Sequence, residues 1–182
     1  MTKTGKIYGD SLYELARETE IKGRAGYCRE LMEQLQAVVQ LFLDNPDYCR
    51  LLQEPSIPRR ERLGLIDRAF GGQAEEYLVN FLKLLCEEEL LTELAGCCEA
   101  YRQRFQKDNN IAQAHVVSAV PLSREQKTAL KEKLQKVWKK EIILITEVDP
   151  DLMGGMKVEI EGRQLDGSVR GRLEKLHKQI RQ

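Results

Sequence analysis

The first 108 or so residues carry apolar side chains at helical spacing. Tyr8, Leu12, Leu15 and Ala16 recur in this way, and so do Leu31, Leu35, Val38 and Phe42. Apolar residues three or four positions apart share one face of an α-helix, which then packs against another element. The pattern therefore predicts amphipathic helices from the start of the chain.

Proline and glycine mark where further helices begin and end. Pro46 can open a helix, Pro55 and Pro58 belong in a turn, and Gly71-Gly72 stops a helix. The helices predicted between these marks span residues 46–53, about 59–70, 73–87 and 90–107. Six helices with short connections predict an antiparallel bundle, whose apolar stripes face one another.

Beyond Asp108-Asn109-Asn110 the pattern changes to that of strands. Strands are predicted at 114–120, 142–148 and 156–160, and the β-branched run at 142–148 predicts a central strand. The glycine-containing connection 149–155 suits either a hairpin or a short excursion. Ser123 and Gln126 form a capping box that opens a helix to about Lys139.

A last helix is predicted from about Ser168. Its apolar stripe consists of Val169, Leu173, Leu176 and Ile180. Its basic face consists of Arg170, Arg172, Lys175, Lys178 and Arg181. The predicted fold class is therefore α+β. An N-terminal six-helix bundle, residues 1–108, precedes a small mixed β-α-β-β-α domain, residues 111–182.

Charge divides along the same boundary. The 182 residues hold 29 Lys and Arg and 29 Asp and Glu, a formal net charge of zero. Through Asn110 there are 15 basic and 19 acidic residues, net −4, and beyond it 14 and 10, net +4. Halves of opposite sign suggest two domains with different partners.

The composition argues against several classes of protein. No apolar run approaches the roughly 20 residues of a transmembrane helix. The N-terminus has neither the apolar stretch of a signal peptide nor an Arg/Ser-rich import leader, which favours a bacterial setting. The five cysteines show no C-x-x-C spacing and mostly fall beside apolar residues, so we expect small buried hydrophobes in a reducing compartment.

No catalytic motif is present. The sequence lacks a phosphate-binding loop, a dinucleotide fingerprint, a zinc-protease motif and a nucleophile elbow. His115 and His177 have no Cys or carboxylate at ligand spacing, and the run Glu87-Glu88-Glu89 points to different sides of a helix. We therefore predict no enzyme activity, no metal and no cofactor.

Two weaker readings concern the second half of the chain. Gly154-Gly155 and Asp166-Gly167-Ser168 suit an anion site at a helix N-terminus, although turns and helix caps use the same residues. The basic domain suits an RNA-binding adaptor. Its strands carry no aromatic residue on which a base could stack, which makes RNA the minority reading.

Two segments near the C-terminus resemble a known family. Leu152-Met-Gly-Gly-Met156 and Leu165-Asp-Gly-Ser-Val-Arg-Gly-Arg-Leu-Glu-Lys-Leu176 are similar to the C-terminal signature of the delta subunits of F-type ATP synthase. This family includes the mitochondrial oligomycin-sensitivity-conferring protein. The signature positions here are Gly154, Gly155, Asp166, Gly167, Ser168 and Arg170. Shorter matches such as Asn45-Pro-Asp-Tyr48 and Asn80-Phe-Leu-Lys-Leu-Leu85 extend the resemblance over nearly the whole chain.

The chain departs from the family pattern at several places. Glu161-Gly162 stands one residue away from the usual Gly-Asp, which predicts a shifted turn and no lost strand. After Leu85, Glu87-Glu88-Glu89-Leu90-Leu91 replaces the family's Glu-Asn-x-Arg-Leu, so a polar contact of that Arg is not expected here.

The resemblance implies a non-catalytic stator subunit. Such a subunit links the catalytic head to the peripheral stalk, so that proton-driven rotation is coupled to ATP synthesis. The implied partners are the N-terminal helix of an alpha subunit, held between the first and fifth helices, and the b subunits, held by the C-terminal domain. No nucleic acid and no direct membrane insertion are implied. The implied location is peripheral, on the cytoplasmic face of the bacterial cell membrane.

The implied groove for the alpha helix maps onto six residues. These are Tyr8, Ser11 and Leu12 of the first helix and Phe81, Leu84 and Leu85 of the fifth. Each apolar member suits the bundle core equally well, because apolar stripes serve both purposes. Ser11 is the most informative, since a small polar residue beside such a stripe suits a groove better than a core.

Overall fold

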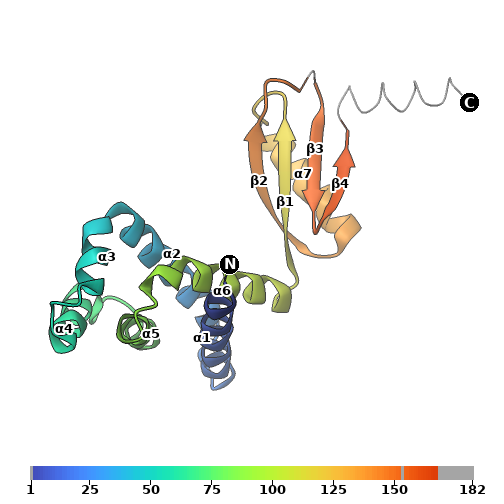
Figure 1. Ribbon diagram of the computed structural model, residues 1–182. Helices are drawn as coiled ribbons and strands as arrows, with labels where there is room; N and C mark the ends of the chain where they lie inside the picture. Colours follow the sequence, from blue (N-terminus) through green and yellow to red (C-terminus); the bar gives the residue numbers. More distant parts are fainter. Residues whose placement is uncertain (1, 153, 168–182) are drawn as a thin grey trace, which may run out of the picture. The chain divides into compact units, whose positions relative to one another are not determined.

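The computed structural model describes residues 2–152 and 154–167. The chain forms two compact units that divide after Phe105, and each unit is described by itself. The first is helical and the second contains a four-stranded sheet with one described helix (Figure 1). This confirms the mixed α+β class.

The helical unit is built from six α-helices and a short 3₁₀ segment, Leu91–Glu93, within its described residues. The helices are α1 (Lys3–Ile21), α2 (Tyr27–Asp44), α3 (Pro46–Gln53), α4 (Arg59–Phe70), α5 (Glu76–Glu87) and α6 (Leu94–Asp108). Thr2 caps α1 by accepting a hydrogen bond from the Gly5 N–H at 3.1 Å. Pro46 is the first residue of α3, where its missing N–H has no intrahelical partner to lose.

Apolar side chains at helical spacing form the core of this unit. Leu31, Leu35, Leu78 and Leu82 are fully buried. The buried Tyr101 hydroxyl donates to the Cys28 carbonyl at 3.0 Å, which satisfies a polar group that would otherwise be costly to bury. These contacts connect α2, α5 and α6.

The second unit contains strands β1 (Ile111–Ser118), β2 (Glu141–Val148), β3 (Met156–Ile160) and β4 (Arg163–Asp166) with helix α7 (Arg124–Trp138). The sheet order is β2-β1-β3-β4. β1 pairs parallel to β2 and antiparallel to β3, and β3 pairs antiparallel to β4. The capping box of α7 is present, since the Ser123 side chain accepts from the Gln126 N–H and the Gln126 side chain from the Ser123 N–H.

This topology corrects two predictions and decides between the two alternatives for a third segment. The run 142–148 lies in β2, an edge strand, and β1 occupies a central position. Segment 149–155 is not a hairpin, because β2 and β3 are separated in the sheet by β1. A fourth strand, β4, was not predicted. The predicted last helix lies outside the described residues.

The turn between β3 and β4 contains the shifted Glu161-Gly162 pair. Both residues have positive φ, 49° and 75°, which matches a two-residue turn of the mirror-image type that suits strand twist. Ile160 and Arg163 are paired on either side of it. The shifted turn therefore produces an additional strand.

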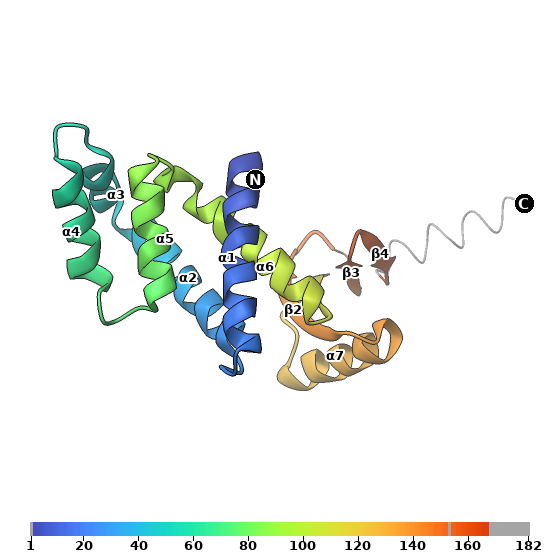
Figure 2. The same cartoon turned by 90° about the horizontal axis from the view of Figure 1, so that it is seen from below.

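Helix α7 covers one face of the sheet (Figure 2). The core between them contains Ala114, Val116, Leu134, Ile142 and Ile160. Because side chains alternate along a strand, the neighbouring residues of β1, β2 and β3 point to the other face.

Candidate partner-binding surface

The six predicted groove residues differ in burial. Leu12, Phe81 and Leu85 are buried, at 2%, 7% and 0% exposure. Tyr8 is half-buried, whereas Ser11 and Leu84 are exposed. Half of the predicted set thus packs the core, and the other half is available to a partner to different degrees.

Further apolar residues of α1 and α5 are exposed beside them. Ile7 and Leu15 of α1 are 55% and 46% exposed, and Tyr77 and Leu84 of α5 are 43% and 41% exposed. Ile7, Ser11 and Leu15 follow one another at intervals of four, and Tyr77 and Leu84 are seven apart, so each set shares a helix face. We call Ile7, Ser11, Leu15, Tyr77 and Leu84 the α1–α5 surface.

Helices α1 and α5 lie side by side in both orientations of the molecule (Figures 1 and 2). Ile7, Leu15 and Tyr77 are not among the six groove residues predicted from the sequence. The spacing around Ser11 was the signal that could have found the first two, because they flank it by four residues on the same face.

The N-terminal end of α5 is fixed by an ion-pair network. Arg24 holds Glu75 by two hydrogen bonds of 2.7 and 2.6 Å, and it also reaches Glu30 at 3.0 Å. The Glu75 N–H donates to Gln34 Oε1 at 2.8 Å. The hydrogen bonds from Arg24 hold the pKa of the Glu75 carboxyl below its usual range. This network positions α5 relative to α2 and the turn before it.

The described residues contain no cluster of side chains suited to holding a metal ion. No group of three or more His, Cys, Asp or Glu side chains in residues 2–152 and 154–167 could hold a metal ion. Burial raises the pKa of the Cys97 thiol to about 11, so it stays protonated and unreactive at neutral pH. No described helix is long and apolar enough to cross a membrane.

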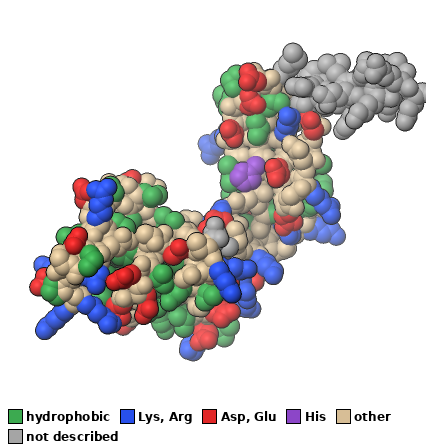
Figure 3. Space-filling view, viewed as in Figure 1, with side chains coloured by type: hydrophobic (Ala, Val, Ile, Leu, Met, Phe, Trp, Pro, Cys, Tyr) green, Lys and Arg blue, Asp and Glu red, His purple; other side chains and the backbone are tan. Residues whose placement is uncertain are grey.

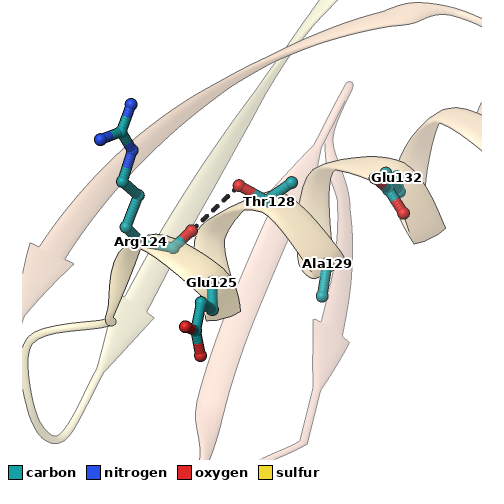
Figure 4. A pocket seen from close by; sticks show the side chains of 5 residues that line it. All are labelled: Arg124, Glu125, Thr128, Ala129 and Glu132. Carbon is teal, nitrogen blue, oxygen red and sulfur yellow. Dashed lines mark hydrogen bonds between the residues drawn. The ribbon is translucent and has the colours of Figure 1, made fainter.

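A depression lies over the first turns of α7. It has a volume of about 520 Å³ and is lined by the exposed residues Arg124, Glu125, Thr128, Ala129 and Glu132 (Figure 4). The Thr128 hydroxyl donates to the Arg124 carbonyl at 3.0 Å within the helix. All five lining side chains are therefore exposed to solvent.

The signature residues of the second unit have backbone roles where they are described. Gly154 and Gly155 have φ values of 140° and 84°, a region that glycine enters without strain. The Gly167 N–H donates to the Met156 carbonyl at 3.0 Å, and Asp166 is paired with Lys157 in the β3–β4 ladder. Ser168 and Arg170 lie outside the described residues.

Comparison with known proteins gives consistent matches over the whole chain. The family model for the ATP synthase delta (OSCP) subunit matches residues 5–180. The ATP synthase subunit delta of Gloeobacter violaceus is 32% identical over 174 residues, covering 95% of this chain and 91% of that protein. The corresponding protein of Desulfitobacterium hafniense strain DCB-2 is 28% identical over 173 residues, with 95% and 93% coverage.

A solved structure has the same fold. A chain of the Toxoplasma gondii mitochondrial ATP synthase hexamer superimposes with a TM-score of 0.66 at 19% identity, covering 100% of this chain and 99% of that one. None of these matches supports RNA binding.

Proposed function

Because the chain belongs to the ATP synthase delta (OSCP) family, we propose that it acts as the stator connector of an F-type ATP synthase. Members of this family are structural, non-catalytic subunits of the synthase, which is a membrane-associated complex. The proposed connector links the catalytic head to the peripheral stalk and resists the torque that the rotor applies. It works at the cytoplasmic face of the cell membrane.

The head contact uses the α1–α5 surface. Its apolar side chains come from two adjacent helices and are partly exposed, which suits the apolar face of a third helix laid between them. The proposed occupant is the amphipathic N-terminal helix of an alpha subunit. The exposure of Leu15 and Leu84, one on each helix, is the observation that carries this proposal.

Calorimetry with a peptide of the alpha N-terminal helix tests this contact. Leu84→Asp places a charge against the apolar face of the peptide, and we expect at least a tenfold weaker affinity, equivalent to about 1.4 kcal/mol. Leu41→Asp is the matched control, because Leu41 is a leucine of similar exposure, 50%, on another helix, α2. Equal affinities of the two variants, or no binding by the folded native chain, would contradict the assignment.

The C-terminal unit binds the b subunits of the stalk. Its support is the positive charge of the second half of the chain, set against the acidic first half. Because the two units carry opposite charges, each attracts and orients a partner whose surface has the complementary charge. By binding the alpha subunit with one unit and the b subunits with the other, the chain would connect the head to the stalk, which is the stator role.

A further inference from the structure

An ion pair connects the two helices of the α1–α5 surface at one end. Arg24 lies in the turn between α1 and α2, residues 22–26, and Glu75 is the residue that precedes α5. The Arg24 guanidinium donates from Nη1 and Nη2 to the two oxygens of the Glu75 carboxylate, at 2.7 and 2.6 Å. The turn that follows α1 therefore holds the beginning of α5.

The backbone around Arg24 is itself fixed. Gly23 and Gly26 have φ values of 118° and 81°, a region that other residues enter only with strain. The Glu20 carboxylate accepts hydrogen bonds from the Gly26 N–H at 3.3 Å and the Cys28 N–H at 3.1 Å. Because the chain is held on both sides of Arg24, the guanidinium starts from a defined position.

The spacing between α1 and α5 depends on such links. Both helices pack against α2, and the Glu75 N–H donates to the Gln34 side chain of that helix at 2.8 Å. Figure 3 shows apolar side chains, in green, exposed over the lower part of the helical unit, where Figure 1 places α1 and α5. The distance between the two sides of the α1–α5 surface is therefore set through α2 and, at one end, by the Arg24–Glu75 pair.

The network around Arg24 also reaches a member of the α1–α5 surface. The guanidinium carbon of Arg24 lies 4.5 Å from the centroid of the Tyr27 ring. The buried Tyr27 ring meets the Tyr77 ring edge-on, with a centroid distance of 6.3 Å and an angle of 68° between the planes. Tyr77 is the second residue of α5 and is 43% exposed, so these contacts end at a side chain available to a partner.

The Arg24–Glu75 pair has a local effect rather than a global one. The two side chains are 46% and 21% exposed, and ion pairs with this exposure contribute little to the stability of a whole domain. The body of α5 is held by Leu82 and Leu85, which are fully buried. Two parallel hydrogen bonds nevertheless fix orientation as well as distance. Loss of the pair should therefore loosen the first turn of α5 and leave the helix folded.

We propose that Arg24 is a positioning residue for the partner of the α1–α5 surface. It fixes the spacing of α1 and α5 at one end of the surface and the orientation of Tyr77. A partner then meets side chains that are already ordered, and less conformational freedom is lost on binding. This inference rests on the proposed function for the identity of the partner, the N-terminal helix of an alpha subunit.

Calorimetry with the alpha N-terminal peptide and the full-length chain tests the effect on binding. Arg24→Gln removes the ion pair, and we expect the affinity to fall about two- to tenfold, because the first turn of α5 must then be ordered on binding. Arg50→Gln is the matched control, since Arg50 forms an exposed ion pair with Asp47 at 3.2 Å on α3, outside the surface. Equal affinities of the two variants would overturn the proposal.

Two more variants test whether the ion pair is responsible. Arg24→Lys keeps the positive charge but cannot form two parallel hydrogen bonds, so it should restore only part of the affinity. Glu75→Ala removes the acceptor without removing a helix cap, because the Glu75 side chain makes no capping bond. Combined with Arg24→Gln it should weaken binding no further than the weaker single variant. Additive losses would show that the two residues act independently, and the proposal would be wrong.

Amide hydrogen exchange tests the positioning without any partner. The Leu78 and Val79 N–H groups donate to the Glu75 carbonyl at 2.9 and 3.0 Å, so their exchange reports opening of the first turn of α5. In Arg24→Gln we expect both to exchange about two- to fivefold faster, with the Leu85 amide unchanged. Unchanged exchange at both positions would overturn the proposal whatever the peptide does. Faster exchange together with no peptide binding by the native chain would contradict the alpha contact and still support the hold of Arg24 on α5.

Discussion

Gly9 lies where α1 packs against α6. A Cβ on this residue would stand 2.3 Å from the Cys97 carbonyl oxygen and 2.7 Å from the Ala100 Cβ. Both atoms belong to a helix, so neither side can yield without moving backbone. Gly9→Ala should therefore lower the free energy of unfolding by about 2 kcal/mol or more, measured by urea denaturation.

Gly64 provides the matched control. It lies inside α4, and an added Cβ would meet nothing within 4 Å. Gly64→Ala should raise the free energy of unfolding by about 0.5–1 kcal/mol, because alanine loses less conformational freedom in a helix. A stabilising Gly9→Ala would show that the helices can separate at no cost.

Stability should fall at alkaline pH because buried groups resist ionisation. Burial raises the pKa of Tyr27 from 10.0 to about 12, and that of Cys97 from 9.0 to about 11. A group with a raised folded pKa contributes stability that is complete below its unfolded pKa and is lost as the pH rises through the folded value. The free energy of unfolding should therefore decline from about pH 9 to pH 12, by up to about 3 kcal/mol for Tyr27.

Tyr27→Phe distinguishes the two groups. The variant should decline less between pH 10 and 12, where burial also raises the pKa of Tyr101, and retain the part that begins near pH 9. Equilibrium unfolding at a series of pH values measures both parts. An unchanged pH profile would mean that Tyr27 ionises as easily in the folded as in the unfolded state.

Single residues also show where sequence periodicity stops being informative. Leu84 and Leu85 are neighbours in one apolar run, yet one is 41% exposed and the other fully buried. Periodicity identifies an apolar stripe on a helix, but the width of the part covered depends on which helices pack beside it. For that reason the prediction of six groove residues mixed core positions with surface positions.

The capping box of α7 should contribute measurably to the second unit. Ser123→Ala removes the acceptor for the Gln126 N–H and leaves one donor of the first turn unpaired, which should cost about 1 kcal/mol. Thr128→Ala is the control in the same helix, because its hydroxyl bonds only to the Arg124 carbonyl and should be nearly neutral. If both variants have the same urea midpoint of unfolding as the native chain, the cap contributes nothing to stability.

Predictions at the level of elements succeeded where a segment carries its own signal. Six helices in the first unit, α7 with its cap and strand β3 were all anticipated from periodicity, proline and capping residues. Strand β4 was missed because Arg163–Asp166 is short and each of its residues is in the exposed class, with no apolar alternation to reveal it. The edge position of β2 was missed because a run of β-branched residues favours a strand without specifying its neighbours.

The sheet order follows from the connections. Helix α7 carries the chain from β1 to a parallel partner, β2, and the next strand then pairs on the free side of β1. No residue in β2 indicates on which side of β1 the next strand will pair. The apolar residues that suggested a central strand lie partly on the face of the sheet that points away from α7.

The whole molecule should unfold in two steps. Each unit has a core of its own, so each can lose its structure as a cooperative unit. Calorimetry should show two transitions, with Gly9→Ala shifting one and Ser123→Ala the other. A single transition shifted equally by both substitutions would show that the two units unfold together.

Strand β1 is made well before either of its partners. Both β2 and β3 follow it along the chain, and β3 ends at Ile160, 42 residues after Ser118. At a synthesis rate of about 5–20 residues per second, that interval lasts about 2–8 s. During this time the helical unit can fold, while β1 has been synthesised but cannot yet pair with both of its neighbouring strands. During this interval β1 has unpaired backbone groups, so we expect the nascent chain to be open to aggregation and to benefit from a chaperone.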